Sequence, residues 1–137
     1  MTDLYRLMER PPTIAEYRSL ISAVDWAEWT NFDASDTALT RSLYHVVALQ
    51  EDAVIGMARV VGDGAMSFYI QNVVVVPVRQ GRGVGTLLLE RITGYPTGAA
   101  PEKAFTGFFA AEGRPLGFAV KSVSTGMSRH VSYVASA

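Results

Sequence analysis

Apolar and polar residues alternate with two different spacings along the chain, which predicts a mixture of helices and strands. Near the N-terminus, apolar side chains follow a helical spacing at Ile14, Tyr17, Leu20, Ile21 and Val24. Pro11-Pro12 interrupts the chain just before them, and Thr13 can cap a helix that has Glu16 in its first turn. We therefore predict a helix from Ile14 to about Val24, after a short strand over residues 4–8.

The middle of the chain is rich in residues that favour strands. Three runs, residues 43–49, 53–61 and 66–76, are separated by turn residues at 50–52 and 62–64. This pattern predicts an antiparallel meander that ends at Pro77, with Gly56 as a candidate bulge. Before it, residues 25–35 read as a loop or broken helix, followed by a short helix near residues 36–42.

After the meander the helical spacing returns, with apolar residues at Val84, Leu87, Leu88 and Ile92 on one face. Gly94 and Pro96 are expected to end this helix. Residues 105–111 and 127–134 are predicted to be the last two strands. The order of elements indicates an α/β fold with one strand–turn–helix crossover.

Composition narrows the class of protein. The 137 residues fit one domain, residues 1–137, and 49% of them are hydrophobic, which is enough for a core. The net charge of −1 argues against nucleic-acid binding, which needs a basic face. The absence of cysteine removes disulfides and thiolate chemistry. No apolar run has the length of a signal peptide or membrane span, so we expect a cytoplasmic protein without a membrane partner.

The most informative segment covers residues 71–92 and reads QNVVVVPVRQGRGVGTLLLERI. Gly81, Gly83 and Gly85 lie between a valine-rich strand and a helix, where backbone N–H groups and the helix dipole can bind an anion such as a pyrophosphate. The glycine spacing does not fit a Rossmann turn, and the absence of a lysine after Gly85 does not fit a Walker A loop. A glycine-rich connection without any ligand stays open at this point.

The pattern Gln80-x-x-Gly83-x-Gly85, after the valine-rich strand and Pro77, resembles the coenzyme A motif of the GNAT acetyltransferase superfamily. The hairpin before it, with residues 55–60 and 68–70, is also similar to that family. The resemblance implies a GNAT-type mixed, mostly antiparallel twisted sheet flanked by helices, here with a shortened C-terminal region. It also implies acetyl-CoA as the co-substrate.

The resemblance also implies a role for each residue of the motif. The pyrophosphate would be bound at Gln80, Gly81, Arg82, Gly83, Val84, Gly85 and Thr86, mostly through backbone N–H groups. Arg82 could add a charge-assisted contact or could be a solvated turn residue. The backbone of Val73, Val74 and Val75 would pair with the pantetheine amides. The N–H of Val74 is our choice for polarising the thioester carbonyl.

Two features depart from the family. Many members place a carboxylate on the central strand as a base, whereas this chain has Gln71-Asn72; Asn72 could orient a water or the amine, or simply be a packed polar residue. No tyrosine lies between Ala111 and Gly117 to protonate the leaving thiolate. Glu112 is the only carboxylate near the expected position, and a turn residue is the more ordinary interpretation of it.

The remaining candidates carry less information. Two separated histidines, His45 and His130, give no recognisable metal site. Trp26, Trp29 and Phe32 could line an acceptor pocket, as the loop after the first helix does in this family, or belong to the core.

The sequence therefore predicts an N-acetyltransferase that moves an acetyl group from acetyl-CoA to a primary amine by direct attack in a ternary complex. The alternative is a coenzyme A-binding protein with weak or lost catalysis, and a general nucleotide-phosphate binder is a weaker third reading. The acceptor could be a small molecule or a peptide amine. Sheet edges near the C-terminus could support a homodimer.

Overall fold

The computed structural model describes residues 4–99, 105–111 and 131–136. The elements in chain order are β1 (Arg6–Met8), α1 (Ile14–Ala23), η1 (Ala27–Trp29), η2 (Phe32–Ala34), α2 (Ser35–Arg41), β2 (Tyr44–Gln50), β3 (Ala53–Gly62), β4 (Ser67–Val75), η3 (Pro77–Arg79), α3 (Val84–Ala99), β5 (Phe105–Ala111) and β6 (Val131–Ser136). The strands form one six-stranded sheet in the order β1-β2-β3-β4-β5-β6. Pairing is antiparallel from β1 to β4 and parallel from β4 to β6.

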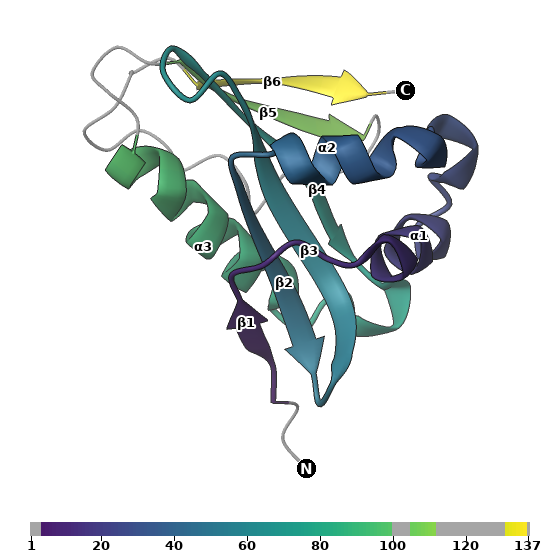
Figure 1. Cartoon of the computed structure of the whole chain (residues 1–137). Helices are drawn as coiled ribbons and strands as arrows, with labels where there is room; N and C mark the ends of the chain where they lie inside the picture. Colours follow the sequence, from purple (N-terminus) through teal and green to yellow (C-terminus); the bar gives the residue numbers. More distant parts are fainter. Residues whose placement is uncertain (1–3, 100–104, 112–130, 137) are drawn as a thin grey trace.

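Helices cover both faces of the sheet (Figure 1), with α3 on one face and α1 and α2 on the other. The alternation along β3 explains this arrangement, because Ala58 and Val60 pack in the core under α3 whereas Met57 packs in the core under α1. Apolar residues on both faces of the central strands therefore require helices on both sides.

Short polar sequences fix the ends of the elements. Thr13 begins α1 with a capping box, in which its hydroxyl accepts from the Glu16 N–H at 3.1 Å and the Glu16 carboxylate accepts from the Thr13 N–H at 2.8 Å. In the hairpin between β3 and β4, the Asp63 carboxylate accepts backbone N–H groups from Ala65, Met66 and Ser67. These contacts also hold the pKa of the Asp63 carboxyl below its usual value.

The structure confirms the predicted α/β fold, with its mixed, mostly antiparallel sheet, flanking helices and antiparallel meander. The expected bulge near Gly56 is present, because Ala48 pairs with Gly56 but Leu49 pairs with Val54, which leaves Ile55 as the extra residue. The last strand begins at Val131, and the shortened region over residues 112–130 lies outside the described residues.

The predicted end of the third helix is wrong. Instead of stopping at Gly94 and Pro96, α3 continues to Ala99. The reason is tertiary packing, because the ring of Tyr95 stacks on Tyr44 with centroids 4.8 Å apart and an interplanar angle of 8°. This contact holds α3 against the sheet just beyond Gly94 and outweighs that local stop signal.

The predicted buried face of α3 is also wrong in one position. Leu87 is 41% exposed, whereas Leu89 is 5% exposed and takes the expected place in the core with Val84, Leu88 and Ile92. Among the residues described here, no helix is long and apolar enough to span a membrane.

Candidate functional site

The backbone edge of β4 is open over its second half. Pairing between β4 and β5 runs from Ser67–Phe105 to Ile70–Phe108 and then ends. Both strands continue, β4 to Val75 and β5 to Ala111, without further pairing between them. The last part of β4 is therefore bonded to β3 alone, and its other edge offers N–H and C=O groups to a ligand.

A bulge interrupts the pairing of β3 with β4 in this same segment. The pairs that flank the interruption are Met57–Val74 and Arg59–Gln71. Ala58 of β3 therefore lies opposite two residues of β4, Asn72 and Val73. Asn72 has a φ of 53°, in the left-handed region that asparagine tolerates better than most residues. Two residues opposite one, the first with positive φ, form a β-bulge.

The direction of the backbone groups after the bulge follows from one hydrogen bond. The Val76 N–H donates to the Ile55 carbonyl at 2.9 Å. Because hydrogen-bonded pairs alternate along an antiparallel ladder, the N–H of Val74 also faces β3. The backbone groups of Val73 and Val75 then face the open edge.

The direction before the bulge follows in the same way. The Asp63 N–H donates to the Ser67 carbonyl at 3.2 Å, and alternation from this pair places the Gln71 backbone toward β3 as well. The backbone N–H and C=O groups of Asn72 therefore face away from β3. The bulge turns two consecutive residues, Asn72 and Val73, to the open edge, which a regular strand cannot do.

The glycine turn lies directly beyond the open edge. Gly81 and Gly83 have φ values of 76° and 87°, and a Cβ on either would meet nothing within 4 Å, so the space beside both is open. The Gln80 side-chain amide donates to the Val75 carbonyl at 2.9 Å and ties the turn to the end of β4.

The first turn of α3 offers unsatisfied donors at the same place. Its first backbone bond runs from the Leu87 N–H to the Gly83 carbonyl, at 3.1 Å. The preceding N–H groups, those of Val84, Gly85 and Thr86, have no acceptor within the helix. Together with the helix dipole they make this end of α3 attractive to an anion.

Residues 41–106 match the family model described as an acetyltransferase (GNAT) domain. The fold is similar to a probable acetyltransferase of unknown function from methicillin-resistant Staphylococcus aureus, with 27% identity, a TM-score of 0.72, and coverage of 78% of this chain and 80% of that one. It is also similar to a GNAT family acetyltransferase from Streptococcus pneumoniae, with 24% identity, a TM-score of 0.62, and coverage of 97% and 76%. Residues 41–106 are therefore similar to a GNAT acetyltransferase domain, and the fold is that of GNAT-family acetyltransferases.

A third structure with a similar fold is an aminoglycoside 6′-N-acetyltransferase complexed with coenzyme A. The identity is 16%, the TM-score is 0.51, and the match covers 64% of this chain and 53% of that one, so the likeness concerns the fold. No curated protein matches the sequence.

The side chain of Asn72 already has a hydrogen-bond partner. Its Oδ1 accepts from Arg59 Nε at 2.7 Å, which uses one of the two lone pairs of that oxygen, and an amide oxygen takes no proton at neutral pH. Arg59 is partly buried, and burial lowers the pKa of its guanidinium from the usual value. The sequence had not singled out Arg59, although a charged residue between Ala58 and Val60 in an apolar strand was a visible signal.

His45 lies opposite Arg59 on the neighbouring strand of the sheet. Its Nε2 is buried and has no hydrogen-bond partner among the described residues. Burial and the Arg59 cation lower the pKa of the imidazole, because both disfavour a second positive charge there. His45 is therefore neutral at neutral pH.

This shift makes His45 a source of pH-dependent stability. Its pKa is lower in the folded than in the unfolded protein, so the unfolded state binds more protons below about pH 6.5. We expect the free energy of unfolding to fall as the pH drops from 7 to 5.5, and His45→Gln to reduce that slope. Urea unfolding at pH 7 and pH 5.5 measures this change in the free energy of unfolding, with His130→Gln as the control. A slope left unchanged by His45→Gln would contradict the assignment.

The three aromatic residues after α1 divide into two groups. Trp26 and Phe32 pack against the core under α1, and Phe32 meets Tyr17 edge to face at 6.2 Å. Trp29 is 69% exposed. The core interpretation therefore holds for Trp26 and Phe32, and Trp29 remains the one at the surface.

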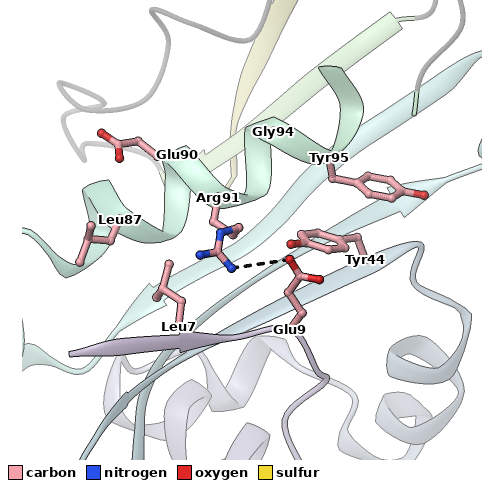
Figure 2. Close-up of a pocket in the computed structure, with 8 residues that line it drawn as sticks. All are labelled: Leu7, Glu9, Tyr44, Leu87, Glu90, Arg91, Gly94 and Tyr95. Carbon is pink, nitrogen blue, oxygen red and sulfur yellow. Dashed lines mark ion pairs between the residues drawn. The ribbon is translucent and has the colours of Figure 1, made fainter. Parts of the chain in front are cut away.

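A separate hollow of about 630 Å³ lies between α3 and strands β1 and β2 (Figure 2). Its lining residues are Leu7, Glu9, Tyr44, Leu87, Glu90, Arg91, Gly94 and Tyr95. Arg91 and Glu9 form an ion pair of 3.6 Å across it. Burial, with the Glu9 carboxylate beside it, raises the pKa of Tyr44 to about 12. None of the predicted site residues lines this hollow.

Two candidate residues from the sequence, Glu112 and His130, lie outside the described residues, so no position is assigned to them. Within the described ranges, no group of three or more metal-ligating side chains could hold a metal ion.

Proposed function

We propose that this protein is a GNAT-type enzyme that transfers an acetyl group from acetyl-CoA to a primary amine by direct attack in a ternary complex. The observation that carries the proposal is the open edge of β4, which ends directly at a glycine turn and a helix N-terminus. An extended pantetheine chain ending in a pyrophosphate needs these two features in this order. The coenzyme A complex of the similar aminoglycoside acetyltransferase supports the same choice of ligand.

Each part of the coenzyme has a place in this arrangement. The pyrophosphate would be bound by N–H groups of the turn and of the first turn of α3, at Gly81, Arg82, Gly83, Val84, Gly85 and Thr86. The pantetheine amides would pair with the open edge at the Val73 carbonyl and at Val75. Gln80 contributes indirectly, because its side chain holds the turn against the Val75 carbonyl.

The acetyl carbonyl would be polarised by the Val73 N–H rather than by the Val74 N–H chosen from the sequence. The Val74 amide faces β3, whereas the Val73 amide faces the open edge beside the bulge. When the amine attacks the carbonyl carbon, negative charge develops on the oxygen, and a fixed N–H there stabilises it. The thiolate of coenzyme A then leaves as the carbonyl reforms.

The amine must reach the thioester without its extra proton. Asn72 cannot act as the base, because an amide does not take a proton at neutral pH. We therefore propose that solvent removes the proton and that the open edge supplies most of the rate enhancement through position and polarisation. The lack of a base at Asn72 also fits the second candidate, a coenzyme A-binding protein with weak catalysis.

One paired experiment decides between the two candidates. Release of free coenzyme A thiol from acetyl-CoA is followed with a panel of amino sugars, polyamines, amino acids and peptides, while calorimetry measures acetyl-CoA binding. Turnover that depends on one class of amine supports the transferase. Binding without turnover across the panel supports the second candidate, and no binding defeats both.

A further inference from the structure

We infer that Arg59 is a positioning residue that holds the β4 bulge and thereby aims the Val73 N–H at the open edge. This inference rests on the proposed function for its consequence in catalysis. Its structural part concerns the unliganded chain and can be tested without any turnover.

Arg59 joins three segments that come from different parts of the chain. Its Nε donates to Asn72 Oδ1 at 2.7 Å, and its Nη1 donates to Ser42 Oγ at 2.9 Å. Its Nη2 makes a longer contact of 3.5 Å with Gln71 Oε1. All three acceptors are neutral oxygens: one from Asn72 in the bulge, one from Gln71 just before it, and one from Ser42, which ends α2.

The shortest of these contacts falls on the residue that makes the bulge. Asn72 has a φ of 53°, a conformation that costs free energy for any residue with a Cβ and reverts to an extended one when nothing opposes it. The bond from Arg59 to its Oδ1 is charge-assisted and fixes the side chain of Asn72 in one position. Arg59 therefore selects the left-handed conformation of Asn72.

The direction of the Val73 amide depends on that conformation. If Asn72 becomes extended and the bulge disappears, strict alternation from Gln71 turns the Val73 N–H toward β3 and away from the open edge. The contact with Asn72 thus controls a donor one residue further along the strand, without touching any ligand.

The anchor of Arg59 on the other side is itself fixed. The Ser42 hydroxyl donates to the Ala38 carbonyl at 2.8 Å, so its lone pair is directed at the guanidinium. Two titratable side chains, His45 and Tyr17, lie near Arg59, and neither carries a negative charge at neutral pH. His45 is neutral, and Tyr17 stays protonated because burial raises its pKa. The geometry of Arg59 is therefore set by hydrogen bonds to neutral groups rather than by an ion pair among the described residues.

The test compares Arg59→Met in two backgrounds, the natural chain and Asn72→Gly. Glycine adopts a positive φ without help, so the bulge no longer needs Arg59. Arg91→Met is the matched control, because it removes an arginine on α3 that is ion-paired to Glu9. The structural readout is the backbone amide NMR signal of residues 72–74 in the protein without acetyl-CoA.

We expect Arg59→Met to move or broaden the signals of residues 72–74 and Arg91→Met to leave them unchanged. With the best amine of the panel, kcat should fall about tenfold for Arg59→Met, while the KM for acetyl-CoA stays within about twofold. In the Asn72→Gly background the same change should alter kcat by less than about twofold. Equal losses in both backgrounds, or unmoved amide signals, would overturn the inference.

A second variant covers the case in which Arg59→Met does not fold. Arg59→Lys keeps the charge and the aliphatic stem but lacks the planar Nε donor, so it should lose kcat in the same way. If it keeps both the wild-type amide signals and the wild-type kcat, the inference is wrong. If the natural protein shows no turnover, the proposed function is wrong. The amide signals of residues 72–74 then test by themselves whether Arg59 holds the bulge.

Discussion

Gly83→Val is expected to weaken acetyl-CoA binding by about 100-fold, as measured by calorimetric titration. The residue has a φ of 87°, and valine disfavours this conformation, so the turn must change shape. The N–H groups that would bind the pyrophosphate then point elsewhere. Loss of one or two hydrogen bonds to a charged group, at about 1.5–3 kcal/mol each, gives an effect of this size.

Gly64→Val is the matched control for this prediction. Gly64 has a φ of 76° in the hairpin between β3 and β4, and its Cβ would make only an ordinary contact of 3.4 Å with Leu43. The backbone strain is therefore similar in the two variants, but only Gly83 lies in the turn beyond the open edge. Equal weakening of acetyl-CoA binding by both would show that Gly83 matters through stability alone.

Removing the Val73 N–H is expected to lower kcat by about 100- to 1000-fold. The substitution replaces Val73 with its α-hydroxy acid, which turns one backbone amide into an ester and deletes a single donor. Loss of one such donor has an effect of this size in other acyl-transfer sites. Because the donor would act mainly on the developing charge, the affinity for acetyl-CoA should change by less than about threefold. Steady-state kinetics and calorimetry measure the two quantities.

The same substitution at Val74 distinguishes the two amides. The Val74 N–H faces β3, so its loss should reduce the free energy of unfolding by about 1 kcal/mol and leave kcat nearly unchanged. If the Val74 ester is the variant that loses kcat while the Val73 ester keeps it, the direction assigned to the backbone groups is wrong.

Much of the fold could be predicted because its signals are local. The capping residue Thr13, the three strand runs and the glycine turn each determine structure within a few neighbouring residues. The end of α3 could not be predicted, because Gly94 and Pro96 are local stop signals that the stack of Tyr95 on Tyr44 overrides. That contact joins residues far apart in the sequence.

In the candidate site, too, the local features could be predicted and the contacts between distant residues could not. The glycine turn and the strand before it were visible in the sequence, but the direction of the β4 amides was not: the sequence favoured the Val74 N–H, which the structure turns toward β3. The direction of the β4 backbone groups depends on the bulge at Asn72; asparagine tolerates a positive φ, but an asparagine within a strand does not by itself predict a bulge. Arg59 was visible as a charge in an apolar strand, but its partners at Asn72 and Ser42 emerge only from the folded arrangement.

The most direct test of the central claim, that the open β4 edge and the glycine turn bind acetyl-CoA, is thermal unfolding with and without that ligand. A ligand that binds only the folded state at roughly 100 times its Kd adds about 2.7 kcal/mol to the free energy of unfolding. We expect saturating acetyl-CoA to raise the Tm by several degrees, and ATP or NAD at the same concentration to raise it much less. A Tm that acetyl-CoA leaves unmoved while ATP or NAD raises it would contradict the account.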